Sequence, residues 1–345
     1  MGTAFLAFLL LLCPAPVTAT INDLDVGNWE VTGNNDIDYT LEATGGTSVV
    51  VSDDATLTNT ESGTALNVQT SGYGVNIGNN AVVSGINAVE ISNGGADISS
   101  TTVTNYGTII GVERTTAPYW PAGYGIGLST GNGENNSIHN YGSILGHRGA
   151  INGITSGLAI TNYAGGEIMI HPDSVYPVRE HAIGIAGSRN AITNSGLISG
   201  GLVSAIGFLG DENTVTNEEV GVITTDGYAV VGFVGNSNVF HNYGTITGTN
   251  LGILASGDDN IINNYSSGLI STSGDGGHGI MVVGGSTASN WGTVETSGAS
   301  AYGMLAFDTS DIYNYSVNSV ITTGDGAHGM VADGTGSVAH NNANV

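Results

Sequence analysis

A short sequence pattern returns along this 345-residue chain about every two dozen residues, and it limits the fold more than any other feature. The pattern is Asn, an aromatic or small residue, Gly, Thr or Ser, and then Ile or Val, as in Asn105–Ile109 and Asn242–Ile246. Later copies begin 23, 25, 22, 26 and 24 residues apart, at Asn194, Asn217, Asn242, Asn264, Asn290 and Asn314. A repeat of this length predicts a solenoid in which each copy forms one turn.

Each copy contains three segments that are typical of short strands. Besides the Asn-Gly pattern there is a small residue followed by alternating apolar residues, as in Gly125–Leu128, and a third segment precedes each Asn, as in Ala191–Thr193. Glycine supplies 56 residues and charged residues only 10%, which favours strands separated by tight turns over helices. We therefore predict an all-β fold, a right-handed parallel β-helix with three strands and about 24 residues per rung.

Asparagines and aromatic residues recur at fixed places in the repeat, and we expect them to stack from rung to rung. Asn tolerates the left-handed backbone of a corner, and stacked amides can form a ladder. One aromatic corner is expected to hold Tyr106, Tyr141, Tyr163, Tyr243, Tyr265, Trp291 and Tyr315. A second is expected to hold Tyr73, Tyr124, His181, Tyr228, His278, Tyr302 and His328. Structural stacking is the favoured interpretation of both sets, and a sugar-binding strip stays open.

The first residues are typical of an export signal. Phe5–Leu12 is apolar and Val17–Ala19 forms a small-residue exit, so we assign residues 1–19 to a signal peptide. Residues 20–50 fit the repeat poorly and are assigned to an N-terminal cap, and residues 51–345 to a solenoid that ends inside a rung. After residue 19 there is no cysteine and no apolar run near the ~20 residues that span a bilayer. The prediction is an exported protein without a membrane-spanning helix.

The charge limits the partners. The net charge is −25, and four arginines are the only cations besides histidine. Binding to nucleic acid or to an anionic membrane needs clustered Lys and Arg, so both are excluded. The acidity favours solubility. No cofactor is predicted, and loose binding of Ca²⁺ at the surface stays open.

Two turns of the repeat carry insertions, which mark a candidate binding face. Asn105 and Asn140 are 35 residues apart and Asn162 and Asn194 are 32 apart, with the surplus at 112–121 and 170–181. Loops inserted at one corner of a solenoid stack on one face. The candidate ligand-binding residues there are Arg114, Tyr119, Trp120, Arg148, His171 and Arg179, beside His147. Arg can hold a carboxylate and an aromatic ring can stack on a sugar; alternatively these arginines only pair with Glu113, Asp173 and Glu180.

No motif identifies a catalytic or metal site. Asp275 and His278 recur as Asp325 and His328, which indicates a repeat feature, and a zinc site needs three or four converging ligands. The carboxylates of the insertions could supply the pair that a glycoside hydrolase needs. Catalysis therefore stays open, and a non-catalytic role is favoured.

The Asn-Tyr-Gly-Thr-Ile motif and runs such as Thr322–Gly329 resemble the passenger domains of bacterial autotransporters over about residues 50–345. The resemblance implies a parallel β-helix, carried to the outer membrane by a C-terminal barrel partner, whereas here the repeat continues to the last residue. It implies an extracellular or cell-surface adhesin or display rod whose partner is a host or cell-surface glycan or a second copy. The alternative is a carbohydrate-active β-helix, a polysaccharide lyase, glycoside hydrolase or sugar-binding module using the inserted face.

Overall fold

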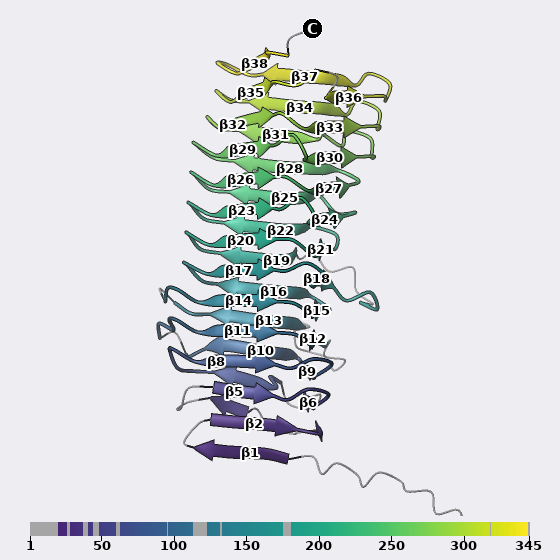
Figure 1. The fold of residues 1–345 in the computed structure, drawn as a ribbon. Coiled ribbons are helices and arrows are strands. Elements are labelled where there is room, and N and C mark those ends of the chain that lie inside the picture. Colours follow the sequence, from purple (N-terminus) through teal and green to yellow (C-terminus); the bar gives the residue numbers. More distant parts are fainter. Residues whose placement is uncertain are drawn as a thin grey trace, which may run out of the picture.

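The computed structural model describes residues 20–25, 28–36, 41–43, 48–59, 63–94, 96–112, 123–131, 133–174, 181–317 and 319–343. All the regular structure in these ranges is β-strand, and they contain no helix. The strands form three sheets wound into one rod, which runs from β1 at one end to β38 at the other (Figure 1). The predicted all-β solenoid with three strands per rung is confirmed, with about 25 residues per turn.

Each rung contributes one strand to each sheet, in the order A, B, C. Sheet A contains β1 Thr20–Asp25, β2 Asn28–Thr32, β5 Ser48–Val51, β8 Gly74–Ile77, β11 Thr102–Asn105, β14 Ser137–Asn140, β17 Ala159–Asn162, β20 Ala191–Asn194, β23 Thr214–Asn217, β26 Val239–Asn242, β29 Ile261–Asn264, β32 Thr287–Asn290, β35 Asp311–Asn314 and β38 Val338–Asn341. Sheet B contains β3 Asn34–Asp36, β6 Thr56–Asn59, β9 Val82–Gly85, β12 Thr108–Gly111, β15 Ser143–Gly146, β18 Glu167–Ile170, β21 Leu197–Ser199, β24 Val222–Thr225, β27 Thr245–Gly248, β30 Leu269–Thr272, β33 Thr293–Thr296 and β36 Val320–Thr322.

Sheet C contains β4 Leu41–Ala43, β7 Leu66–Val68, β10 Asn87–Ser92, β13 Tyr124–Ser129, β16 Gly149–Ile154, β19 His181–Ala186, β22 Ser204–Leu209, β25 Ala229–Val234, β28 Leu251–Ser256, β31 Ile280–Val283, β34 Tyr302–Phe307 and β37 His328–Asp333. Pairing is parallel except between β1 and β2, which are antiparallel. β2, β3 and β4 pair in parallel with β5, β6 and β7, so the rung pattern begins within residues 28–43.

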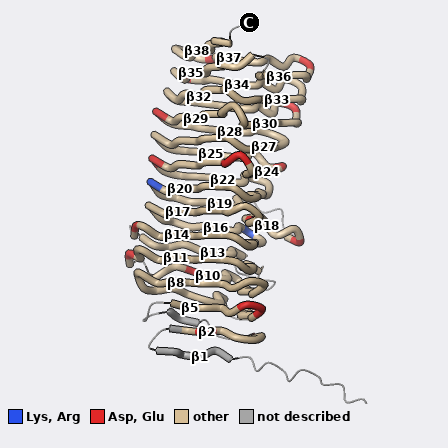
Figure 2. Tube along the Cα trace, viewed as in Figure 1, with Lys and Arg blue, Asp and Glu red and all other residues tan. Residues whose placement is uncertain are grey.

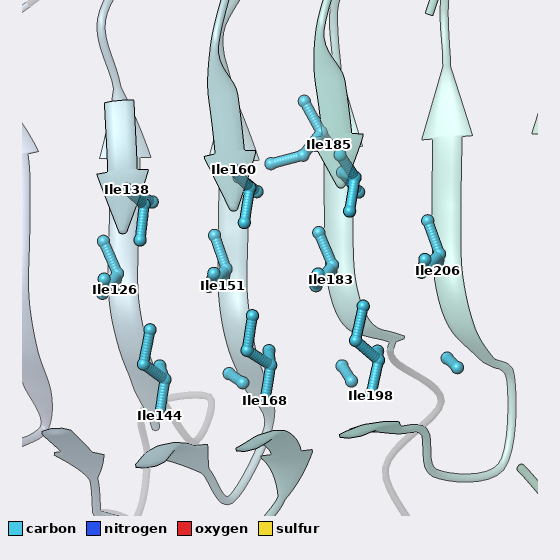
Figure 3. Packing of buried hydrophobic residues seen from close by; sticks show 14 of the residues in the cluster. Ile126, Ile138, Ile144, Ile151, Ile160, Ile168, Ile183, Ile185, Ile198 and Ile206 are labelled. Atoms are coloured by element: carbon cyan, nitrogen blue, oxygen red, sulfur yellow. The ribbon is translucent and has the colours of Figure 1, made fainter. Parts of the chain in front are cut away.

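The core is a set of isoleucine columns that follow the rod. In one rung Ile138 from sheet A, Ile144 from sheet B and Ile126 from sheet C all point inward and are fully buried. Each lies beside the equivalent isoleucine of the next rung, as Figure 3 shows. Burying one such side chain stabilises the fold by about 1.5–3 kcal/mol. Because every rung repeats the set, each turn is held mainly by its two neighbours.

A ladder of asparagine amides runs along the corner between sheets A and B. Each buried Asn donates from Nδ2 to Oδ1 of the Asn in the next rung, at 2.8–2.9 Å, and also to backbone carbonyls of the turn. The ladder joins Asn105, Asn140, Asn162, Asn194, Asn217, Asn242, Asn264, Asn290 and Asn314. The predicted ladder is confirmed, but its asparagines are not in the left-handed region. They are used for their amides, not for their backbone.

A glycine follows each ladder asparagine from Asn105 to Asn290, two or four residues later, and is needed for close approach. A Cβ on Gly142 would overlap the carbonyl oxygen of Gly107 in the rung below. Stacked turns at this corner therefore pack with no room for a side chain at this position, which explains why a glycine recurs in each turn.

A second ladder, which we did not predict, lies at the corner between sheets C and A. Oδ1 of Asn213, Asn238 and Asn260 each accepts hydrogen bonds from the backbone N–H and the Nδ2 of the preceding asparagine, at 2.9–3.1 Å. Its members are Asn190, Asn213, Asn238 and Asn260, followed by Ser286. The residues just before them, such as Arg189 and Glu212, are left-handed.

Charged residues are concentrated in the turns. Figure 2 shows Asp and Glu mainly at the edges of the rod, with long uncharged stretches along the strands. Among the residues that the structure describes, no helix is long and apolar enough to cross a membrane.

Candidate functional site

Both insertions leave the rod at the same corner. The first lies between β12 and β13 and the second between β18 and β19, and each of these pairs joins sheet B to sheet C. The intervening rung makes the same connection from β15 to β16 through His147 and Arg148. The predicted common phase of the insertions is therefore confirmed.

Of the candidate ligand-binding residues, Arg148 and His171 belong to the described part of the chain. Arg114, Tyr119, Trp120 and Arg179 lie outside the described residues. So do the carboxylates Glu113 and Glu180, which leaves Asp173 as the described acidic residue of the insertions. The prediction of a site formed by all six residues stays a prediction.

The described part of this corner brings two histidines together. The rings of His147 and His171, from consecutive rungs, are stacked with centroids 4.3 Å apart and planes 22° apart. Nδ1 of His147 lies 3.0 Å from the Gly111 carbonyl oxygen, and the backbone N–H of Asp173 donates to Nδ1 of His171 at 3.2 Å. These contacts hold Nδ1 of each ring on the protein side.

Arg148 lies on the sheet C side of the same turn. Its guanidinium carbon is 5.7 Å from the centroid of the Tyr124 ring in the rung below. A cation over a tyrosine face at this distance contributes about 0.5–1 kcal/mol at an exposed site. Arg148, Tyr124, His147 and His171 thus form one cluster, which we call the histidine corner.

Burial lowers the pKa of His171, and the neighbouring His147 lowers it further, while Asp173 acts in the opposite direction. Neutral imidazoles stack without mutual repulsion, whereas two protonated rings would repel. The lowered pKa favours the neutral imidazole of His171, which lies in the same cluster as the guanidinium of Arg148 and forms a surface suited to hydroxyl and carboxylate groups.

The first aromatic corner is stacked as predicted, but in two separate ladders. Tyr106, Tyr141 and Tyr163 stack at 4.7 and 4.0 Å, and Tyr243, Tyr265, Trp291 and Tyr315 stack at 4.3, 5.7 and 4.9 Å. Ser195 and Glu218 occupy the column between the two ladders, since their backbone N–H groups continue the same hydrogen-bond series. The ring faces inside each ladder are covered by neighbouring rings, so a sugar would meet mainly ring edges there.

The second predicted aromatic corner was partly wrong. His278 and Tyr302 do stack, at 4.8 Å, and Tyr302 contacts His328. Tyr73, however, is buried ahead of a sheet A strand, where burial raises its pKa to about 12, and Tyr228 lies one residue before the register position of His181. Tyr73 therefore belongs to another sheet, and Tyr228 lies one residue outside the column.

The repeated Asp-His pair serves the neighbouring rung. Asp275 accepts a hydrogen bond from the backbone N–H of Ala299, and Nδ1 of His278 accepts one from the N–H of Tyr302. Both side chains bridge to the next turn, in line with a repeat feature. Within the described ranges, no three His, Cys, Asp or Glu side chains are grouped to hold a metal ion.

Two hollows lie on the surface of the rod, near the corner between sheets B and C and on sheet C itself. A shallow one of about 630 Å³ lies between Asp226, Asn250, His278 and Met281. Tyr228 separates it from an apolar groove of about 410 Å³ on the outer face of sheet C, lined by Ile154, Gly184, Gly207, Leu209, Gly232 and Val234 among others.

No family model, curated protein or solved structure matches the chain in the three comparisons.

Proposed function

We propose that the chain is an exported passenger-type β-helix that acts as a non-catalytic adhesin or display rod at the bacterial cell surface. The observation that carries the proposal is continuous stacking. Isoleucine columns, two amide ladders and two aromatic ladders all bind one rung to the next. The polar side chains of the amide ladders form hydrogen bonds between rungs and are not available to bind a substrate. This arrangement suits a stiff spacer. The resemblance to autotransporter passengers supports the same role.

A sugar-binding role through the histidine corner is the second candidate. Arg148 over Tyr124, beside the stacked His147 and His171, combines donors with aromatic surface. Such a mixture suits a glycan that carries a carboxylate.

A glycan-array screen of residues 20–345, with and without Ca²⁺, tests both roles. Binding without turnover would support the adhesin, and release of cleavage products from a bound glycan would overturn it in favour of a carbohydrate-active enzyme. The absence of binding to any glycan on the array would argue against a glycan partner and would leave the display rod as the proposed role.

Any glycan that binds can be assigned to a face with matched arginine variants. Arg148→Ala removes the guanidinium of the histidine corner, whereas Arg189→Ala removes one that pairs with Glu134 at the corner between sheets C and A, at 2.6 Å. If the histidine corner binds, Arg148→Ala weakens binding about tenfold or more and Arg189→Ala leaves it unchanged. Equal effects of the two variants would show that the corner is not the site.

A further inference from the structure

The outer face of sheet C is the most apolar exposed surface of the described chain. Ile154, Leu209 and Val234 are 66%, 60% and 52% exposed, and they belong to one register column that Ala186 completes. We call this column the ridge. Leu202 and Tyr228, 53% and 59% exposed, lie on the other side of the same face. Contiguous apolar surface of this kind usually marks a binding surface.

Beside the ridge runs a column without side chains. Gly184, Gly207 and Gly232 occupy consecutive register positions, so they form the floor of the 410 Å³ groove. A Cβ on Gly232 would meet no atom within 4 Å, so that part of the floor is open. The His181 ring lies over Gly207. Ridge and groove are thus parallel neighbours along the rod.

The face also lacks charge. Three columns face outward on sheet C, and from β13 to β34 their described residues include no Asp, Glu, Lys or Arg. Glu90 and Asp333 are the first acidic residues met on either side. In a chain of net charge −25, a partner of the same charge meets the least repulsion here.

We propose that two copies of this chain pair side by side through the outer face of sheet C. A two-fold axis parallel to the rod reverses the order of columns in the second copy, so Val234 of each copy lies over the open floor at Gly232 of the other, and Leu209 lies against the His181 ring that covers Gly207. Such a contact is self-complementary, as a two-fold interface must be. The pairing does not depend on the adhesin role.

The size of the face fits a reversible dimer. Eight strands, from β13 to β34, span about 34 Å at 4.8 Å per strand, and six residues span about 18 Å. With the ridge over the glycine column, two of the three outward columns overlap, so the contact covers about 400 Å² on each copy and about 800 Å² in total, the size of a weak, transient interface. Because each rod is strongly acidic, screening by salt strengthens the pair.

Sedimentation velocity over a range of concentrations tests the proposal, with thermal melts to show that each variant folds. Leu209→Glu places a carboxylate in the contact and should weaken association about tenfold or more. Ile261→Glu is the matched control, because Ile261 is an exposed isoleucine on sheet A, 44% exposed. Gly232→Leu places a side chain in the groove at a position where a Cβ would meet no atom within 4 Å, and should also abolish the pair.

The pair should also tighten when NaCl is raised. A wild-type chain that stays monomeric at high salt would overturn the proposal, as would a dimer that Ile261→Glu breaks and Leu209→Glu does not. A monomer that binds an apolar dye, with binding lost in Gly232→Leu, would likewise overturn pairing and assign the groove to a small apolar ligand.

Discussion

At the scale of single residues, the ladder asparagines carry the largest predicted effects. Asn217 is fully buried, accepts from Nδ2 of Asn194 at 2.9 Å and donates to Oδ1 of Asn242 at 2.9 Å. Asn217→Ala removes the donor to the buried Oδ1 of Asn242 and one of the acceptors of Asn194 Nδ2, and should cost about 1–3 kcal/mol. Asn76→Ala, at an exposed position on β8, should change stability by less than about 0.5 kcal/mol. Urea unfolding followed by circular dichroism measures both, and equal midpoints would contradict the ladder's role.

The half-buried histidines make stability depend on pH. Burial lowers the pKa of His171, His181, His241 and His278 in the folded chain. The unfolded chain then binds more protons than the folded chain below the ordinary histidine pKa of about 6.5. The stabilisation is therefore complete above that pH and is lost as the pH falls below it.

Melting temperatures at pH 7.5 and pH 5.5 check the sign of this effect. His181→Gln, which removes the imidazole beside Ser204, should reduce the drop, because burial lowers the pKa of this histidine. If the melting temperature of His181→Gln falls by as much as that of the wild type between pH 7.5 and pH 5.5, this histidine does not contribute to the pH dependence.

At the scale of elements, the interrupted aromatic column allows a gain of stability. Ser195 follows Tyr163 in the column, and the face of Tyr163 on that side carries no ring. Ser195→Tyr should extend the first ladder by one stack, worth about 1 kcal/mol. The Ser195→Tyr variant should melt at a higher temperature than wild type. Tyr265→Ala removes the stacks at 4.3 and 5.7 Å and should melt at a lower temperature. A Ser195→Tyr chain that melts no higher than wild type would mean that the stacks add nothing.

The same elements show how much of the fold the sequence could predict. The first asparagine ladder was predictable because its asparagines recur at the same place in the repeat and a glycine follows most of them two or four residues later, where the turns approach closely. The second ladder was missed because its asparagines follow variable pairs such as Ser188-Arg189 and Asp211-Glu212. Its spacing of 22–25 residues was the only available signal.

The candidate site was less predictable than the fold for a physical reason. Rungs fix one another's register, so a repeat reveals which residues meet. An insertion has no equivalent in the next rung, and its side chains are placed by contacts that periodicity does not encode. His147 and His171 could be placed together only because each lies close to a strand end.

At the scale of the whole molecule, the net charge of −25 opposes the compact state. Repulsion between turns that carry Asp and Glu falls as salt is added, since the screening length drops from about 30 Å at 0.01 M to about 10 Å at 0.1 M. The melting temperature should therefore rise between these NaCl concentrations. An unchanged or lower melting temperature would show that charge repulsion is not a major cost of folding.

Divalent ions separate diffuse screening from specific binding. Diffuse screening depends on ionic charge and concentration, so Ca²⁺ and Mg²⁺ at equal concentration should raise the melting temperature equally. Ca²⁺ binds six to eight oxygen ligands in a flexible geometry, whereas the smaller Mg²⁺ needs a nearly ideal octahedron. A site built for Ca²⁺ therefore binds Mg²⁺ less well. Among the described residues, no three acidic or histidine side chains are grouped to hold a metal ion. We therefore expect Ca²⁺ and Mg²⁺ to shift the melting temperature equally. A larger shift with Ca²⁺ would contradict pure screening and would indicate a specific calcium site.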